Sequence, residues 1–534
     1  MQFIKEVNDV LQQENWQAVN RDLAAKMLSE YMYEDMIQPQ EVTRKGRRIN
    51  YSLTLPENIE YTFQAEKRLF DSYHVFPETI QYKNKNGTEE VKAVQFLLDL
   101  AEKLGMTADT TGHLIKEINH TLIADAHIAN HSITADEIVE MDYAEIEGEM
   151  AGHPWITYNK GRIGFGYDDY LAYAPENKKE VPLSWLAVHK DRITFRGVHG
   201  LDHEKVLRHE LDSGTLEFFK TVLKDKDVDP EAYFFMPVHE WQWQNVVIPL
   251  FSEELAAGAI IPLGKGSDHY LPQQSIRTFA NISDREKYHV KVPMSILNTL
   301  VYRGLPAERT VIAPNVTQYI QGIRNNDPFL RDECRLITPG EVASINYDHP
   351  HYSKLPGAPY QYLEMLGCIW RESIYQYIKE GEHPITLAAL LHVDKNGKPV
   401  ISSLVERSGL SLQEWLSRLF HVTLPPVLHY LYKYGTVFSP HGQNTILVLK
   451  DHQPHRLAMK DYVDDVNVSD QPLPELEALP QDLKEVLRSE PPEGLVQFIF
   501  TGLFICHFRY LSDLLEIHHG YSERAFWTQV REVI

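Results

Sequence analysis

The sequence predicts an α+β fold in three parts, because its pattern changes twice along 534 residues. Apolar residues at helical spacing dominate residues 1–150, with two short alternating runs that predict strands. Short apolar runs between aromatic and turn residues predict a strand-rich part over residues 151–345. Long helical patterns return over residues 346–534, interrupted by one predicted hairpin. A chain of this length needs two or three domains, not one core.

The first part begins and ends with predicted helices. Apolar residues recur at helical spacing at Phe3, Val7, Val10, Leu11, Val19, Leu23 and Met27, and a helical period returns over residues 91–130. Alternation over 49–55 and 61–63 predicts two strands between these helices. This part is therefore mixed but rich in helix.

Two segments of the second part predict strands: RITFRGV at 192–198 and VKVPMSIL at 290–297. The stretch from 339 to 359, with its Gly, Pro and His residues, predicts a loop or a domain junction. Long helical patterns begin after Tyr360.

Composition excludes several classes of protein. A net charge of -23 argues against binding a nucleic-acid backbone. Cys334, Cys368 and Cys506 are odd in number and form no CxxC pair, which argues against a disulfide framework or a zinc site. The opening residues do not resemble a signal peptide, and the apolar stretch 495–508 is too short to span a bilayer. We therefore expect a cytoplasmic protein without a membrane partner.

The hairpin is predicted within FSPHGQNTILVLKDHQPHRLAMKDYVDD, residues 438–465. TILVLK and RLAMKD are strand-like and flank a turn-forming cluster. A turn centred between His452 and Gln453 pairs Asn444 with Asp461 on adjacent strands. An amide oxygen beside a carboxylate suits Mg²⁺. The alternative is that Asn444 caps a turn and Asp461 merely ends a strand.

Two segments, 271–281 and 289–310, combine cations with short hydrogen-bonding side chains, as a polyphosphate requires. These residues are Ser275, Arg277, Thr278, Lys291, Asn298, Thr299 and Arg303. Lys291 and Ser295 alternate with apolar neighbours, which is also the pattern of an ordinary solvated strand face.

A third candidate segment, 152–176, places His153, Lys160 and Arg162 near several glycines. Its GRIGFG run is not a dinucleotide-binding fingerprint. His239, in FFMPVHEWQWQN, and His507, in FICHFRY, are interpreted as histidines of the core, the second with its hydrogen bonds satisfied.

Taken in order, these segments resemble the aerobactin-synthetase-like siderophore synthetases that work independently of nonribosomal peptide synthetases. The family pattern GHP…K…R.GF matches residues 152–165, and P.H.WQ matches 237–242. S.RT matches 275–278, and HGQN…D matches 441–444 with Asp461. The run NTLVYRGLP at 298–306 looks like the form in part of that family.

The resemblance implies a cupped hand: a helical thumb over 1–150, β-rich fingers over 151–345 and a helix-rich palm over 346–534. ATP would lie between fingers and palm, distantly as in kinases. The enzyme would adenylate a carboxylate of citrate, a citryl derivative or 2-oxoglutarate, and pass the acyl group to an amine or hydroxyl. AMP and pyrophosphate would be released, and dimers are common in the family.

Carried over by motif, the resemblance also implies roles for residues. Those expected to bind ATP are Ser275, Arg277, Thr278, Lys291, Asn298, Arg303, His441, Gln443 and Asn444. The catalytic groups would be Lys291, Arg303 and His441. The polycarboxylate would lie near His153, Lys160 and Arg162. Asp461 and Asn444 would hold Mg²⁺.

The chain departs from the family pattern in two places. Ser439 and Pro440 stand where many members have Glu-Ala, which alters the metal site if that Glu helps to hold the ion. After Asp461 the family is often Gly-rich, whereas Asp464 and Asp465 occur here. We interpret these two acids as solvated loop residues, with attraction of a cationic amine as the alternative.

Two other functions compete with this prediction. A small-molecule kinase could use a similar HGxN…D site. A kinase, however, needs a catalytic Asp shortly after the His-Gly, where Gln443 stands. An interaction protein with a degenerate site is the non-enzymatic alternative, although the cationic and metal-type residues are all present.

Overall fold

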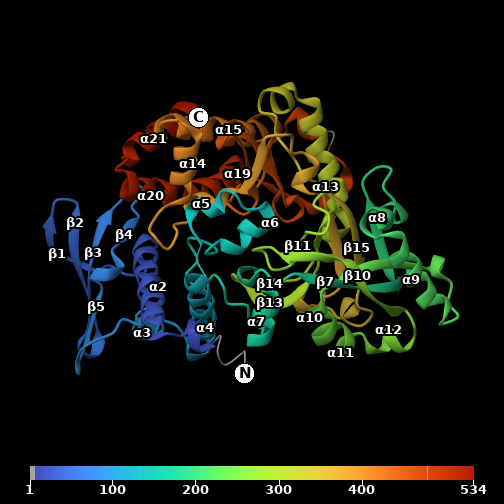
Figure 1. The fold of residues 1–534 in the computed structure, drawn as a ribbon, viewed down its shortest axis with the longest axis horizontal. Coiled ribbons are helices and arrows are strands. Elements are labelled where there is room, and N and C mark those ends of the chain that lie inside the picture. The colour runs from blue at the N-terminus through green and yellow to red at the C-terminus, as the bar shows by residue number, and fades with distance from the viewer. Residues whose placement is uncertain (1–6, 132, 478) are drawn as a thin grey trace.

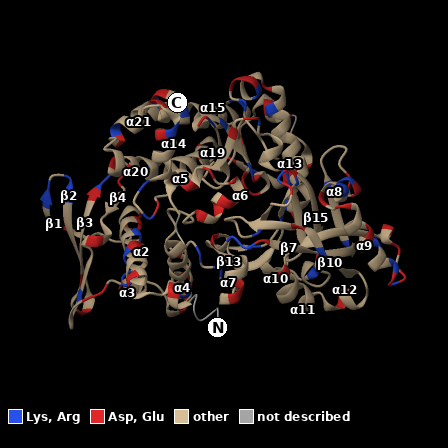
Figure 2. Ribbon diagram, viewed as in Figure 1, with Lys and Arg blue, Asp and Glu red and all other residues tan. Residues whose placement is uncertain are grey.

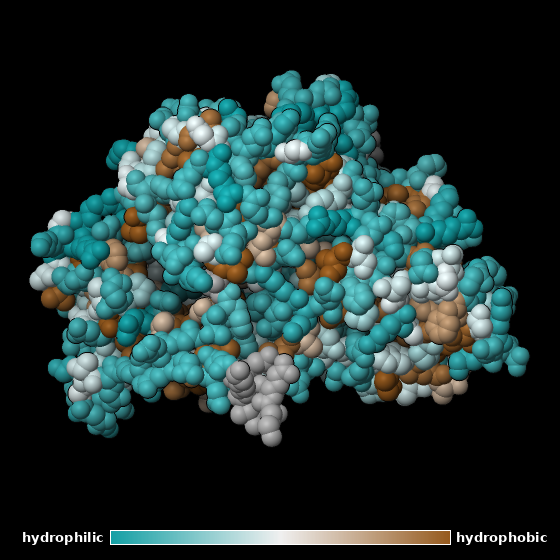
Figure 3. Space-filling view, in the orientation of Figure 1, coloured by the Kyte–Doolittle hydropathy of each residue, from teal (hydrophilic) through white to brown (hydrophobic). Residues whose placement is uncertain are grey.

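The computed structural model describes residues 7–131, 133–477 and 479–534, so Phe3 of the predicted first helix lies outside it. Figure 1 shows an N-terminal sheet at one end, a large sheet at the other and C-terminal helices above both. Lys and Arg are interspersed with Asp and Glu along the whole ribbon (Figure 2). The face in Figure 3 is mostly hydrophilic, with small, separate hydrophobic areas.

The N-terminal region is a six-stranded antiparallel sheet packed against helices. Its apolar face contacts α2 and α3, since alternate residues of β2 are buried. Both predicted strands are confirmed, in a sheet larger than a helical thumb implies. The helices are α2 (Gln13–Tyr33), α3 (Ala93–Ala101) and α4 (Ala108–His131); the strands are β1 (Gln40–Lys45), β2 (Arg48–Leu55), β3 (Ile59–Lys67), β4 (Tyr73–Val75), β5 (Gln81–Asn84) and β6 (Gly87–Glu89).

Contacts with the last helices of the chain anchor this sheet. The Arg68 guanidinium bonds to Asp513 over 2.5 Å, and the Leu69 N–H donates to Glu523 over 2.8 Å. Arg509 donates to Glu30 on α2 over 2.9 Å. Asp513 and Glu523 belong to α20 (Arg509–His519) and α21 (Glu523–Val533). Residues more than 440 positions apart in sequence therefore form one interface.

The middle of the molecule is an eight-stranded antiparallel sheet in the order β8-β15-β16-β12-β11-β10-β7-β9. Its strands are β7 (Val181–His189), β8 (Ile193–Gly197), β9 (Tyr233–Val238), β10 (Ile260–Pro272), β11 (Thr278–Asn281), β12 (His289–Lys291), β15 (Glu341–Tyr347) and β16 (Gly367–Arg371). Helices α8 (His203–Glu210), α9 (Ser213–Lys224) and α13 (Ala307–Asn326) belong to this region. The sheet carries the largest apolar cluster of the described residues.

Two predictions for this region are wrong. The segment 290–297 is not one strand: β12 ends at Lys291, and β13 (Met294–Asn298) pairs separately with β14 (Val301–Arg303). Pro293 lies at the break, where it has no N–H to donate to a sheet. Lys291 is consequently not on a solvated face but only 3% exposed.

The second prediction, a loop over 339–359, holds for 348–359, apart from the 3₁₀ turn η9 (Tyr352–Lys354), but is wrong for β15. All seven residues of β15 are buried, and β15 pairs with both β8 and β16. The expected division at 345/346 falls inside this strand. The sheet also takes in β16, from residues assigned to the third part.

The C-terminal region packs helices around two small sheets. The helices are α14 (Val400–Ser408), α15 (Leu412–Tyr434), α16 (Tyr462–Asp465), α17 (Pro474–Glu477), α18 (Gln481–Val486) and α19 (Pro492–Ile499), followed by a π-helical stretch η13 (Phe500–Phe508), then α20 and α21. The strands are β17 (Glu382–Thr386), β18 (Thr436–Val437), β19 (Thr445–Lys450), β20 (Gln453–Met459), β21 (Asn467–Ser469) and β22 (Arg488–Glu490).

The predicted hairpin is confirmed as β19 and β20, but its register is not. Its turn residues Asp451 and His452 have φ of 51° and 58°, so the turn is centred one residue earlier than predicted. A bulge follows Val448, and Thr445 pairs with Met459. The Lys460 N–H then donates to the Asn444 carbonyl over 3.1 Å. Asn444 therefore does not pair with Asp461, because a one-residue slip turns each side chain to the other face.

Helices α19, η13 and α20 form one continuous run, Pro492–His519. By length and composition alone it could cross a membrane, but 56% of its most apolar window is buried inside the protein. The prediction that the apolar stretch is too short to span a bilayer considered only residues 495–508, which are part of this run. Burial among other helices is what a core helix of a globular protein shows.

Candidate active site

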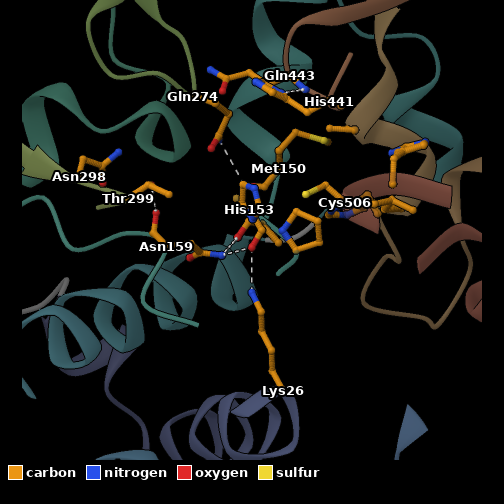
Figure 4. A pocket seen from close by; sticks show the side chains of 18 of the residues that line it. Lys26, Met150, His153, Asn159, Gln274, Asn298, Thr299, His441, Gln443 and Cys506 are labelled. Atoms are coloured by element: carbon orange, nitrogen blue, oxygen red, sulfur yellow. Dashed lines mark hydrogen bonds between the residues drawn. The ribbon is translucent and has the colours of Figure 1, made fainter. Parts of the chain in front are cut away.

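A cavity of about 360 Å³ lies where the three regions meet. Figure 4 shows Lys26 reaching it from α2, Asn298 and Thr299 on one side, His441 and Gln443 on another, and Cys506 opposite. The lining residues are Lys26, Met150, Ala151, Gly152, His153, Pro154, Asn159, Arg162, Gln274, Asn298, Thr299, Arg303, Ala388, Leu391, His392, His441, Gly442, Gln443, Cys506 and His507. Lys, Arg and His are among them, but Asp and Glu are not.

Two glycines hold the His441–Asn444 loop in place. A Cβ on Gly442 would lie 3.1 Å from Ala388, in the 3₁₀ stretch η12 (Leu387–Leu391). A Cβ on Gly502, in η13, would lie 3.1 Å from Pro440 and 3.2 Å from the His441 nitrogen. The loop is therefore clamped between two helical segments, and His441 is aimed by close backbone packing.

Left-handed backbone conformations cluster around the cavity. Ile276, in the turn between β10 and β11, has φ of 63°, and Thr299, in the β13–β14 hairpin, has φ of 48°. Arg162 and Asp461 also have positive φ, at 43° and 67°. Such conformations are costly for residues other than glycine and persist where the surroundings hold them, often at functional sites.

Several residues predicted to bind ATP have a buried polar atom without a hydrogen-bond partner in the protein. These atoms are Ser275 Oγ, Arg277 Nε, Thr278 Oγ1, Asn298 Oδ1 and Arg303 Nε. Unpaired buried polar atoms are uncommon and call for a ligand or water. Burial and the neighbouring Arg277 lower the pKa of Arg303 to about 9. An anion beside Arg303 would offset that cost.

Lys291 lies behind the cavity in a network of charged side chains. Its Nζ contacts Asp461 over 2.6 Å and Asp464 over 3.1 Å, with Glu341 at 3.7 Å. Asp461 also accepts from Arg371 over 3.1 Å, and Asp464 accepts from Arg277 over 3.0 Å. The expectation that Asp464 is a solvated acid is wrong, because these contacts hold it in the network.

Asn444 connects to this network through Asp465, to which its Nδ2 donates over 2.6 Å. Burial, together with Asp464 and Asp461, raises the pKa of Asp465 to about 7. Asp465 is therefore not a solvated acid either. Excess negative charge at this point favours a bound cation.

His441 lines the cavity and is neutral near pH 7, because burial lowers its pKa to about 4. Its Nδ1 accepts from the Gln443 N–H over 3.3 Å, which leaves Nε2 free to act as a donor. A neutral imidazole can hydrogen-bond a developing charge, as the sequence predicted.

The three residues expected near a polycarboxylate do not all line the same cavity. His153 lines the cavity, and its Nδ1 accepts from the N–H groups of Trp155 and Ile156. Arg162 also lines it, but both of its terminal nitrogens bond to Glu176. Lys160 does not line it: its Nζ contacts Asp125 over 2.7 Å, beside a second cavity of about 510 Å³. Lys160 therefore has no direct route to a ligand in the first cavity.

The structure brings part of the predicted set together. Seven predicted residues line the cavity: His153, Arg162, Asn298, Thr299, Arg303, His441 and Gln443. Behind or beside it are Ser275, Arg277, Thr278, Lys291, Asn444, Asp461 and Lys160. Among the described residues, no three His, Cys, Asp or Glu side chains are grouped as metal ligands.

Sequence reasoning missed Lys26, His392 and Cys506 as lining residues. His507 was interpreted as a satisfied core histidine; it is fully buried, but neither ring nitrogen has a partner in the protein. His239 is a core residue, stacked on Phe279, with one ring nitrogen unpaired. No local signal distinguishes these two histidines, because the difference is which one borders the cavity.

Comparison with known proteins defines the class. Residues 142–392 match the IucA / IucC family, and residues 413–534 match the family described as Ferric iron reductase FhuF-like transporter. The chain is 43% identical to the rhizobactin siderophore biosynthesis protein RhbF of Rhizobium meliloti, over 98% of this chain and 86% of the relative. It is 35% identical to a putrebactin synthase of a Shewanella species, over 98% and 82%.

The fold agrees with these matches. The aerobactin synthetase IucC of Klebsiella pneumoniae superposes with a TM-score of 0.88 at 30% identity, over 97% of this chain and 91% of that one. The fold is thus that of siderophore synthetases. This chain belongs to the IucA/IucC family of such enzymes. Its relatives are named synthases and ligases, so the kinase alternative is not supported.

Proposed function

We propose that this siderophore synthetase uses ATP to adenylate a carboxylate of citrate or of a citryl derivative, and then condenses it with an amine or hydroxyl. The supporting observation is the cavity, whose lining charges are all cationic and whose Arg303 and Asn298 have unpaired polar atoms. A polyanion would satisfy both features. Among the relatives, one from Bacillus anthracis is named a citryl-spermidine ligase, and an ATP-bound aerobactin synthetase IucA shares the fold.

The phosphates of ATP are assigned to the side of the cavity formed by the β10–β11 turn and the β13–β14 hairpin. Ser275, Arg277 and Thr278 would meet them together with Asn298 and Arg303, in an ATP site between fingers and palm. Fixed cations and short donors stabilise charge as a carboxylate oxygen attacks the α-phosphorus and pyrophosphate leaves. His441 would donate a hydrogen bond to the developing charge.

The polycarboxylate is assigned to the neighbouring wall, at His153 and Arg162. The Lys26 Nζ donates to the His153 carbonyl over 2.9 Å, which fixes the chain beside this wall. Lys160 would act indirectly, by holding the Ala151 carbonyl over 2.5 Å and so shaping the loop. A homodimer and a cytoplasmic location stay predictions.

Mg²⁺ is assigned to the oxygen atoms of Asp461 and Asn444, joined by Asp465. Carboxylate and amide oxygens are the ligands that this ion prefers, but both Asp461 oxygens contact cations, Lys291 and Arg371, so the ion would replace one of these contacts. The raised pKa of Asp465 agrees with a site that gains from a cation. When bound, Mg²⁺ would neutralise phosphate charge.

Pyrophosphate release in the absence of the amine substrate tests the proposal. Purified enzyme is given ATP, Mg²⁺ and hydroxylamine as the trap, with citrate, citryl monoamides, 2-oxoglutarate and monocarboxylic acids in separate reactions. We expect AMP, pyrophosphate and a hydroxamate with a di- or tricarboxylate, citrate first. A panel of primary amines and diamines then replaces hydroxylamine, and amide formation is followed by mass spectrometry.

The outcomes separate the steps. Formation of ADP would indicate a kinase. Pyrophosphate release that requires an amine would contradict an adenylate-first reaction. Turnover of monocarboxylic acids alone would contradict the siderophore reaction itself.

A further inference from the structure

One wall of the cavity has no role in the proposed adenylation. Leu391 and His392 reach it from the end of η12, and Cys506 and His507 from η13. Both segments flank the His441 loop through the close contacts of Gly442 and Gly502. This wall therefore lies beside the place where the acyl-adenylate would form.

His507 is the unusual group on this wall. It is 0% exposed, it borders the cavity, and neither of its ring nitrogens has a hydrogen-bond partner in the protein. His392 adds a second unpaired ring nitrogen, Nε2. A buried polar atom without a partner costs free energy, so unpaired ring nitrogens on residues that line a cavity point to a ligand that completes the bond.

The charges of the cavity define which ligand fits. Lys26, Arg162 and Arg303 line it, and none of the described residues contributes a carboxylate to its lining. An ammonium group would find no counterion there and would be disfavoured by burial and by like charge. An unprotonated amine can instead donate its N–H to a neutral imidazole. Burial lowers the pKa of His507 to about 3, so this ring is a neutral acceptor near pH 7.

We propose that His507, assisted by His392, forms the subsite that holds the attacking nitrogen of a primary amine in its unprotonated form. This inference rests on the proposed function. The amine loses its proton to solvent on entering, and its lone pair attacks the acyl carbon. The new C–N bond forms as the C–O bond to AMP breaks, and the second proton leaves the nitrogen for solvent. His507 accepts an N–H hydrogen bond and orients the lone pair.

The location in a π-helical stretch agrees with this role. The residues from Phe500 to Phe508 form i→i+5 turns inside the long helix Pro492–His519. Such insertions are uncommon and frequently lie at functional sites. The neighbouring Cys506 lines the same cavity as His153. A nitrogen bound at His507 would therefore lie in the cavity that also contains the wall assigned to the polycarboxylate.

The test separates the two half-reactions in His507→Phe. This variant keeps an aromatic ring but removes both acceptors. Hydroxylamine-trapped pyrophosphate release with citrate should stay within about twofold of wild type, because hydroxylamine at high concentration needs no subsite. Condensation with the best amine of the panel should fall at least tenfold, mainly through a higher KM for the amine. His507→Asn, which keeps an acceptor, should recover part of the loss.

His239→Phe is the matched control. His239 is also buried with an unpaired nitrogen and a pKa lowered to about 3, but it does not line the cavity. Any effect of this change should be equal on both half-reactions. Equal losses in His507→Phe, or none, would overturn the inference. If the wild-type enzyme released no pyrophosphate with any carboxylic acid, this would instead contradict the proposed function.

A crystal structure provides a measurement that needs no variant. Wild-type protein with citrate, α,β-methylene-ATP and the amine should place a nitrogen within about 3.2 Å of a His507 ring nitrogen. An amine nitrogen bound to a carboxylate elsewhere would overturn the assignment.

Discussion

Arg303 and Lys291 carry the same charge close to one another, yet the protein holds them differently. Arg303 borders the cavity and has an unpaired Nε, whereas Lys291 contacts Asp461 and Asp464 and is 3% exposed. A cation with free donors is available to a ligand. A cation enclosed by carboxylates mainly supports those carboxylates.

Replacing Arg303 by Ala should lower adenylation without unfolding the protein. Loss of one charge-assisted contact in the transition state costs about 2–4 kcal/mol, or roughly 10²–10³ in rate. The measurement is hydroxylamine-trapped pyrophosphate release together with thermal melting. Arg44→Ala, whose side chain is 56% exposed, is the control. Activity of Arg303→Ala within twofold of wild type would contradict the assignment.

Lys291→Ala should differ from Arg303→Ala. Lys291 is the cation that both Asp461 and Asp464 contact, and its loss would leave them only Arg371 and Arg277 respectively. Breaking a buried ion pair costs about 3–5 kcal/mol. We therefore now expect a lower melting temperature as well as lost activity.

At the scale of elements, the active site depends on how closely two helical segments approach one loop. Gly502 of η13 contacts the backbone at Pro440 and His441, and Gly442 contacts Ala388 of η12. Neither glycine is needed for a positive φ. Each is needed because there is no space for a side chain.

Gly502→Ala should displace the His441 loop. The added methyl would lie 3.1–3.2 Å from Pro440 and His441, closer than ordinary contact. Overpacking of this kind costs about 1–3 kcal/mol, and we expect adenylation to fall roughly tenfold. Gly322→Ala, in α13 with nothing within 4 Å, is the matched control and should stabilise by about 0.5–1 kcal/mol. Unchanged activity in Gly502→Ala would show that the loop is not clamped.

At the scale of the whole molecule, many histidines are buried in the neutral form. Burial lowers the pKa of His153, His239 and His507 to about 3 and that of His203 and His441 to about 4. In the unfolded chain each would titrate near 6.5. In acid, these histidines therefore take up protons when the chain unfolds, and this uptake lowers the free energy of unfolding.

These histidines lower stability as the pH falls, whereas Asp465, Glu341 and Glu364, whose pKa values burial raises to about 7, act in the opposite direction. A lowered folded-state pKa contributes stability that is complete above pH 6.5 and is lost as the pH falls towards 3–4. Each such histidine should lower the free energy of unfolding at pH 5.5 by about 1.4 kcal/mol relative to neutral pH. Melting temperatures at pH 7.5, 6.5 and 5.5 measure this. His113→Ala, removing a side chain that is 75% exposed, should leave the slope unchanged. His203→Phe removes one buried histidine and should lessen the loss of stability towards pH 5.5; an unchanged slope in this variant would contradict the prediction.

Patterns of local sequence predicted much of the fold and less of the site. Periodicity located β2, β3, α4 and the β19–β20 hairpin, because each presents one apolar face to a core. It failed at β15, which is buried on both faces and lies between residues typical of turns. The hairpin register failed at a bulge, which no spacing reveals.

The same limit applies to single residues. Motifs pointed to Arg303 and His441. The charge of a residue alone, however, does not reveal that Lys160 and Lys291 form ion pairs with carboxylates of the protein. Lys26 belongs to α2 and reaches the cavity only because the N-terminal region docks there. That docking depends on contacts along the whole chain, so no sequence pattern near Lys26 predicts it.

The contacts of Arg68 and Leu69 with the last helices have a consequence for biosynthesis. Asp513 follows Arg68 by 445 residues, so at 5–20 residues per second the ribosome takes roughly 20–90 s to supply the partner. The N-terminal sheet can pack on α2 and α3 during that time, but its docking surface stays open to solvent and to chaperones. The cavity at the junction can therefore be completed only after translation has passed His507, the last residue that lines it.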